Sequence, residues 1–302
     1  MKYRIGVDIG GMSVKIGVVD GEFNVVEKHR FHTGDGCTAE YIINGIIDKC
    51  KEMKEKYPIH SIGIGSPGRV DFENGTVIVA GNLPFKNTPI AVEVSKALGL
   101  PTFIENDGSC ALIGESASGA CKGCSDAIII TIGTGIGGAI ILDNKLVHGY
   151  KLGAGELGHF VIDRNGEQCT CGLKGCFEQY ASATALIEQT KRAIEENPEC
   201  LLAEIAREEL TGKTVFDAAD NGCEVAKAVL KEYGHILADG INSLAHIFQP
   251  QMIVLSGGIA NQGKTLLSLS QPYLLHDVEI ATTELNGDGG IVGAAILDTI
   301  YG

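Results

Sequence analysis

Residues 155–178 read GELGHFVIDRNGEQCTCGLKGCFE, which places one histidine, His159, upstream of three closely spaced cysteines, Cys169, Cys171 and Cys176. Thiolates and imidazole are the ligands that Zn²⁺ prefers, and three cysteines with one histidine complete a tetrahedral structural site. Gly172 and Gly175, which lie between the second and third cysteines, allow the turns that would aim the sulfurs at one point. The alternative is a set of unconnected free cysteines, which are common in protein interiors. The spacing favours a zinc site over this alternative.

Two carboxylates flank the cysteine cluster, since Glu156 precedes it and Glu178 follows it. A metal site that holds Glu156, His159 and Glu178 together could form one rigid wall of a site for a polar ligand. Taken singly, each glutamate is better explained as a solvated surface charge, because glutamates are mostly exposed.

Length and composition narrow the class of protein. The 302 residues are enough for one large domain or two of medium size. The net charge of −14 argues against a nucleic-acid partner, whose phosphates require clustered lysine and arginine. Ten cysteines, with no signal peptide before the first strand pattern, indicate a reduced, cytoplasmic setting. The most apolar run, residues 127–142, is too short to span a bilayer, so no membrane partner is expected.

One short pattern occurs twice in the chain. Strand residues 4–9 lead through Gly10-Gly11 into a second strand at 14–19, and residues 127–132 lead through the glycine-rich 133–138 into 139–142. The repeat predicts a pseudo-duplicated α/β protein whose two glycine turns face a shared cleft and hold a polyphosphate from two sides. From the residues alone, the first turn is slightly better explained as a plain hairpin. Asp8 beside it either faces a metal–phosphate complex or caps the turn.

A second candidate site follows the predicted strand at 102–105. Asn106 and Asp107 come directly after it, and a helical pattern continues from Asp107 toward Gly119. Ligands of α/β sheets collect outside the carboxyl ends of the strands. An aspartate at this point is also a common helix N-cap. Position alone favours the cap for Asp107.

The remaining elements follow from periodicity and turn residues. The predictions are helices at 38–56, 181–210 with a break at 197–198, 215–219, 224–248 and 289–301, strands at 59–64, 251–255 and 277–281, a hairpin turn at Asn74-Gly75, and a helix opened by Thr88 as N-cap with Pro89 and closed by Gly99. His148 and His246 are expected to be isolated surface or core histidines. Cys121 and Cys124 are expected to be structural or exposed thiols.

Six motifs together resemble the ROK family of bacterial sugar kinases and sugar-responsive repressors. They are DIGG at 8–11, GSPG at 65–68, END at 105–107, GTGIG at 133–137, ELGH at 156–159 and CTCGLKGCFE at 169–178. The resemblance covers nearly the whole chain and implies an α/β, two-domain actin-like ATPase (ribonuclease H-like) fold with a central cleft and a zinc-binding loop. The implied domains are a small N-terminal α/β domain, 1–108, on which a final helix at about 289–302 packs, and a larger α/β domain, 109–288, with the zinc loop at 159–178.

The resemblance also implies how the sugar is bound. Asp107 would be the general base that takes the proton of the attacking sugar hydroxyl. The hydroxyls would be bound by Asn106, Asp107, Glu156, His159 and Glu178, with Gly68 and Asn82 lining the same pocket. His159 would bind zinc through one ring nitrogen and the sugar through the other, and the structural zinc would be completed by Cys169, Cys171 and Cys176.

The nucleotide site implied by the resemblance uses the two glycine turns. Asp8 would help to position Mg²⁺, and the ATP phosphates would contact Gly10, Gly11, Ser13, Gly133, Thr134 and Gly135, with Gly257 and Gly258 against the nucleoside. Two positions depart from the family pattern. Met12 stands where the family usually has Thr, so that a phosphate contact would be either lost or passed to Ser13, and Ser109 stands where Asn is common.

The function that these motifs imply is that of an ATP-dependent hexose kinase that makes glucose 6-phosphate from glucose. N-acetylglucosamine, N-acetylmannosamine and fructose are alternative acceptors, because kinases for these sugars share the motifs. A non-catalytic, sugar-sensing regulator is the alternative of another class. Repressors of the family carry an N-terminal helix-turn-helix, whereas here the first strand pattern starts at Tyr3. By resemblance alone, a homodimer or a dimer of dimers is expected.

Overall fold

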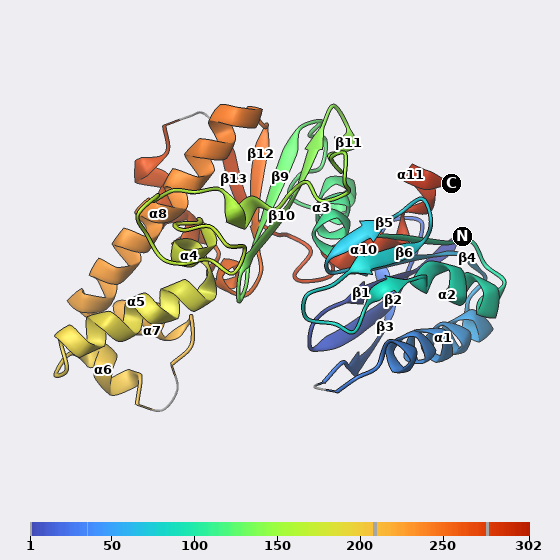
Figure 1. The fold of residues 1–302 in the computed structure, drawn as a ribbon, viewed down its shortest axis with the longest axis horizontal. Helices are drawn as coiled ribbons and strands as arrows, with labels where there is room; N and C mark the ends of the chain where they lie inside the picture. Colours follow the sequence, from blue (N-terminus) through green and yellow to red (C-terminus); the bar gives the residue numbers. More distant parts are fainter. Residues whose placement is uncertain (1, 35, 208–209, 276–277) are drawn as a thin grey trace. The chain divides into compact units, whose positions relative to one another are not determined.

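The computed structural model describes residues 2–34, 36–207, 210–275 and 278–302 (Figure 1). The chain forms two compact units. Unit 1 comprises Met1–Cys124, Leu146–Ala154 and Glu284–Gly302, and unit 2 comprises Ser125–Lys145 and Gly155–Thr283. The domain boundary expected at 108/109 falls within unit 1, at the first turn of a helix that packs on the C-terminal helices of the same unit.

Unit 1 is built on a five-stranded sheet with the order β3-β2-β1-β4-β8 (Figure 1). Its strands are β1 (Tyr3–Ile9), β2 (Ser13–Val19), β3 (Val25–His32), β4 (Ile59–Ser66) and β8 (Thr102–Asn106). The first three strands form an antiparallel meander, β4 runs parallel to β1, and β8 runs parallel to β4. A small antiparallel sheet contains β5 (Arg69–Asp71), β6 (Thr76–Val79) and β7 (Lys86–Thr88). The parallel pairing places the carboxyl ends of β1, β4 and β8 at one edge of the main sheet.

Helices cover both faces of this sheet. They are α1 (Ala39–Lys56), α2 (Ile90–Leu98), α3 (Asp107–Ser118), α10 (Gly289–Ala295) and α11 (Asp298–Tyr301). The buried isoleucines of α1 share a core with Ile5 and Val7 of β1. Gly6 points to the other face, where an added Cβ would collide with the carbonyl of Ile291 in α10. The missing side chain at Gly6 therefore allows the C-terminal part of the chain to pack directly on the first strand.

Unit 2 repeats the sheet of unit 1. Its strands are β9 (Ala127–Ile132), β10 (Ile136–Leu142), β11 (Lys145–Leu146), β12 (Met252–Ser256) and β13 (Glu279–Thr282), in the order β11-β10-β9-β12-β13. As in unit 1, the first two strands form an antiparallel hairpin across a glycine turn, and two parallel strands follow on the other side of the first strand. The duplication predicted from the two glycine turns is confirmed by this matching order.

The helices of unit 2 begin where the zinc loop ends. They are α4 (Glu178–Ala181), α5 (Ala183–Glu196), α6 (Leu201–Ile205), α7 (Thr214–Asp220), α8 (Glu224–Phe248) and α9 (Lys264–Ser270), with the 3₁₀ turns η1 (Leu157–His159), η2 (Ile259–Gln262) and η3 (Gln271–Tyr273). The buried hydroxyl of Tyr233 in α8 donates to the Ala181 carbonyl at 2.8 Å. This bond ties the end of α4 to the longest helix of the unit.

Several predicted helix ends are wrong. Pro89, and not Thr88, is the N-cap of α2, because Thr88 ends β7 and its hydroxyl accepts a hydrogen bond from the Lys86 amide. The helix predicted at 289–301 is two helices, α10 and α11. The helical stretch predicted at 181–210 with a break at 197–198 corresponds to α5 and α6, and residues 208 and 209 of this stretch lie outside the described residues. The strand predicted at 277–281 corresponds to β13, and Asp277 lies outside the described residues. Within the described parts of the chain, no helix is long and apolar enough to cross a membrane.

Candidate functional site

The cysteines and histidine of the opening stretch come together in unit 2. The Nδ1 or Nε2 of His159 and the Sγ atoms of Cys169, Cys171 and Cys176 all lie within 4.8 Å of one another. Cys169 Sγ is 3.5 Å from His159 Nδ1, and Cys171 Sγ is 3.5 Å from Cys176 Sγ. Ligands on a tetrahedral zinc, with Zn–S near 2.3 Å and Zn–N near 2.0 Å, are roughly 3.5–3.8 Å apart. The donor set and its spacing therefore fit a structural Zn²⁺.

The backbone of the loop explains how the ligands meet. Val161 and Cys176 form an isolated antiparallel bridge, and the Cys169 amide donates to the Leu173 carbonyl at 2.8 Å. Gly175 has φ +72°, and an added Cβ would collide with the carbonyl of Asp163. The left-handed turn beside a tight backbone contact is the reason for a glycine at this point.

The thiols of the cluster differ in acidity. Burial raises the pKa of Cys176 to about 12, and hydrogen bonds with Cys171 and Cys169 add to the shift. For Cys169, burial is outweighed by hydrogen bonds from the backbone and thiol of Cys171, and the pKa falls to about 7. One thiol is thus close to ionisation at neutral pH, which favours its use as a metal ligand.

The two glutamates that flank the cluster differ in their environments. Glu156 is exposed, and its backbone carbonyl accepts the His159 amide at 3.1 Å. Glu178 begins α4, is half-buried, and its Oε2 accepts the Ile136 amide at 2.8 Å. An added Cβ on Gly135 would collide with this carboxylate. The second glycine turn is therefore required, at least in part, by the close approach of Glu178.

In unit 1, Asn106 and Asp107 lie where β8 ends and α3 begins. Asn106 Oδ1 accepts the Ser109 amide at 3.1 Å, and Asn106 Nδ2 donates to the Gly68 carbonyl at 3.1 Å. The prediction that Asp107 caps the helix is wrong, because Asn106 has the extended backbone (ψ 145°) and the side-chain bond of the N-cap. Gly68 is thereby joined to Asn106, whereas Asn82 is exposed in the loop between β6 and β7.

The carboxyl group of Asp107 has an unusual environment. Its Oδ1 accepts the Gly108 amide at 2.9 Å. Burial, and then the negative charge of Asp8, raise the pKa of Asp107 from 3.8 to about 6. The pKa of Asp8 is also raised by burial, an effect that Lys15 at 3.3 Å partly offsets. The ends of β1 and β8 thus present two carboxyl groups that influence each other, and a bound cation would relieve their repulsion.

Each of the two glycine turns contains a hydrogen bond between backbone groups. The Gly10 amide donates to the Ser13 carbonyl at 2.9 Å, and the Gly133 amide donates to the Gly135 carbonyl at 2.9 Å. In the first turn Ser13 is buried and Met12 is 80% exposed. An added Cβ would meet open space at Gly11 and likewise at Gly258. Gly257 has φ +94° and packs against the carbonyl of Ile132, so this glycine is required by the end of β9.

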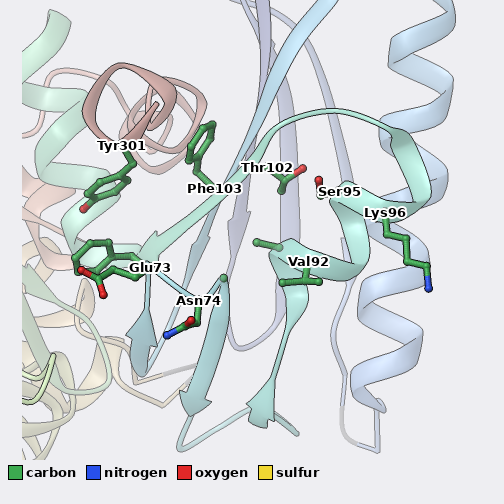
Figure 2. Close-up of a pocket in the computed structure, with 11 residues that line it drawn as sticks. Glu73, Asn74, Val92, Ser95, Lys96, Thr102, Phe103 and Tyr301 are labelled. Atoms are coloured by element: carbon green, nitrogen blue, oxygen red, sulfur yellow. The ribbon is translucent and has the colours of Figure 1, made fainter.

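The sequence did not predict one polar cluster of unit 1. His148, expected to be isolated, has its Nε2 2.8 Å from Glu105 Oε2, and the hydroxyl of Tyr301 donates to the same oxygen at 2.6 Å. Glu105 belongs to the END motif, but His148 and Tyr301 carry no local signal. A pocket of about 630 Å³ lies beside this cluster and is lined in part by Phe72, Phe103 and Tyr301 (Figure 2).

Comparison with known proteins supports the motif-based assignment. The family model described as "ROK family" matches residues 4–299. The glucokinase of Streptomyces coelicolor is 35% identical, with 98% of each chain covered. The glucokinase of Thermotoga maritima is 32% identical, with 96% of this chain and 95% of that protein covered. The crystal structure of a ROK family glucokinase from Streptomyces griseus, in complex with glucose and AMPPNP, has a TM-score of 0.84 at 34% identity and 98% coverage of each chain.

The duplicated α/β sheets, the Cys/His cluster and these relatives define the class as ATP-dependent sugar kinases with an actin-like ATPase fold. The chain belongs to the ROK family.

Proposed function

We propose that this sugar kinase transfers the γ-phosphoryl group of ATP to the 6-hydroxyl of a hexose, with glucose as its preferred acceptor. The observation that carries the proposal is the carboxyl group of Asp107, which has a raised pKa at the carboxyl end of β8 and lies next to the immobilised Asn106. The names of the relatives support glucose as the acceptor.

Asp107 is proposed as the general base. With a pKa of about 6, it is ionised at neutral pH and still basic enough to accept a proton as the sugar oxygen attacks. The Gly108 amide donates to Oδ1 of the carboxyl group and holds the side chain at the start of α3. Phosphoryl transfer needs mainly positioning and charge neutralisation, so a single oriented base is a sufficient acid–base group.

The sugar hydroxyls are proposed to bind five side chains, those of Asn106, Asp107, Glu156, His159 and Glu178. Gly68 and Asn82 are proposed to line the same pocket. His159 directs Nδ1 toward Cys169, so Nε2 is the ring nitrogen left for a hydroxyl. The Ile136 amide holds Oε2 of Glu178, which leaves Oε1 for the sugar.

A structural Zn²⁺ on His159, Cys169, Cys171 and Cys176 is proposed to orient the histidine and not to react. With Nδ1 on the metal, His159 would keep one ring orientation and one tautomer, and its Nε2 would keep one direction. When bound, zinc would supply structural cross-linking of a loop with little regular structure.

ATP is proposed to contact the two glycine turns. Asp8 would hold Mg²⁺, which neutralises phosphate charge when bound. The proposed phosphate and nucleoside contacts are Gly10, Gly11, Ser13, Gly133, Thr134, Gly135, Gly257 and Gly258. Among them, Gly11 and Gly258 have open space beside their Cα atoms, which allows close approach of a ligand.

A coupled ADP-release assay with Mg-ATP tests the proposal across glucose, mannose, fructose, N-acetylglucosamine and N-acetylmannosamine. The highest kcat/KM is expected for glucose. A clear preference for another sugar would replace glucose and leave the kinase assignment intact. Sugar binding by calorimetry without turnover on any sugar would instead support a non-catalytic regulator. Light scattering on the same sample tests the expected homodimer.

A further inference from the structure

Glu105 is a buried carboxylate whose two oxygens are both occupied. It is 2% exposed and stands one residue before Asn106. Its Oε1 accepts the Asn106 amide at 2.7 Å, and its Oε2 accepts the Tyr301 hydroxyl at 2.6 Å and lies 2.8 Å from His148 Nε2. A buried charge requires such partners, because an unpaired carboxylate in the interior is costly.

The partners of Glu105 are themselves held by an aromatic ring. Phe72 stacks on His148 with ring centroids 4.4 Å apart, and on Tyr301 with centroids 4.8 Å apart. Tyr301 lies at one end of the pocket close to Glu73, at the wall opposite Lys96 (Figure 2). Burial, and then the charge of Glu105, raise the pKa of the Tyr301 hydroxyl, so it stays a hydrogen-bond donor. Three segments far apart in the chain thus converge on one carboxylate.

We propose that Glu105, Tyr301 and His148 are positioning residues that set the geometry of Asn106 and Asp107 for the sugar. The Asn106 backbone is fixed by Glu105, while its side chain is fixed by Gly68 and Ser109. A shift of Glu105 would therefore be passed to Asn106 and, through the next peptide, to Asp107. This inference rests on the proposed function, which assigns the sugar to Asn106 and Asp107.

The three residues of the cluster come from distant parts of the sequence. Tyr301 belongs to α11, 196 positions from Glu105, and His148 is 43 positions from it. Through Tyr301, the short helix α11 would affect sugar binding without contacting the sugar. Its expected signature is a change in the sugar parameters with the ATP parameters preserved.

Replacement Tyr301→Phe removes the hydroxyl and keeps the ring on Phe72. A hydrogen bond to a charged group is lost, so we expect kcat/KM for the sugar to fall roughly tenfold. KM for the sugar should rise and kcat should fall, with KM for ATP unchanged. The matched control is Tyr41→Phe, which removes the hydroxyl of a 53% exposed tyrosine on α1 and should leave every parameter unchanged.

A second readout does not depend on turnover. Hydrogen exchange of the peptide that covers residues 102–112 should become faster in Tyr301→Phe, because Glu105, which accepts the Asn106 amide, loses one of the partners that hold its carboxylate. Exchange should be unchanged in Tyr41→Phe. The same measurement on His148→Gln covers the case in which the first variant does not fold.

The possible results separate this inference from the proposed function. An active wild-type enzyme with normal sugar kinetics and normal exchange in Tyr301→Phe overturns the positioning role and leaves the kinase assignment standing. Equal increases of both KM values, with a lowered melting temperature, also overturn it, since they indicate a general loss of structure. If the wild type is inactive, faster exchange in the variant still supports the coupling from Tyr301 to Asn106.

Discussion

The proposed sugar ligands are held in two different ways in the two units. In unit 1, Asn106 and Asp107 are placed by a parallel strand, a helix start and the buried carboxylate of Glu105. In unit 2, His159 and Glu178 lie at the two ends of a loop with only isolated bridges and a short 3₁₀ turn, and the four side chains of the proposed zinc site come together there. This loop has little regular strand pairing, so we expect its order to depend on the proposed zinc.

The difference predicts that the two regions fail in different ways. A change in unit 1 should alter the chemistry while the fold stays intact, because the sheet holds the residues around it. A change in the metal cluster should alter sugar binding and local order together. The following predictions test this contrast, starting with the largest expected effect.

Replacement Asp107→Asn should lower kcat by about 10²–10⁴-fold, which is the usual contribution of a general base. The amide keeps an oxygen for the Gly108 amide, so the helix start should survive. The folded pKa of about 6 lies above 3.8, which means that the ionised carboxylate destabilises the folded state as pH rises through 6. The melting temperature at pH 7.5 should therefore be equal to or higher than that of the wild type. A kcat near the wild-type value would remove Asp107 from its role.

Replacement Cys171→Ser should release zinc and weaken sugar binding by roughly 10- to 100-fold, because His159 loses the metal that orients it. Metal content by mass spectrometry and sugar affinity by calorimetry measure the two effects on one sample. The control is Cys37→Ser, a change of a half-buried free cysteine in unit 1. Full sugar affinity in a zinc-free Cys171→Ser protein would contradict the link between metal and ligand site.

The two regions also differ in how much of their structure the sequence predicts. The four proposed zinc ligands lie within one short stretch whose spacing is typical of a metal site, so the sequence could predict that they come together, and the structure brings the four side chains together. The cap at β8–α3 was assigned to the wrong neighbour, because Asn and Asp are both good N-caps and the choice depends on the backbone angle at Asn106. The Glu105 cluster could not be predicted, because its partners are 43 and 196 positions away and no local pattern marks His148 or Tyr301.

The kinase activity should also depend on pH, because it is proposed to depend on Asp107 of unit 1. Asp107 must be ionised to accept a proton, and burial beside Asp8 raises its pKa to about 6. At saturating Mg-ATP, kcat/KM for the sugar should fall close to tenfold per pH unit as the pH drops below about 6. Asp107→Asn should lack this acid limb in its residual activity. A wild-type profile that stays flat down to pH 4.5 would contradict the assignment.

The smallest expected effect comes from substitutions that compare the two glycine turns. Replacement Gly135→Ala places a methyl group against the Glu178 carboxylate, whereas Gly11→Ala places it in open space. Displacing Glu178 should cost about 1 kcal/mol, the lower end for overpacking, and raise KM for the sugar roughly fivefold. Gly11→Ala should leave the sugar KM unchanged, and any effect should fall on KM for ATP, because that turn is proposed to contact phosphate. Steady-state kinetics with each substrate varied in turn separate the two results. A larger sugar effect from Gly11→Ala than from Gly135→Ala would mean that the close approach of Glu178 to Gly135 has no part in sugar binding.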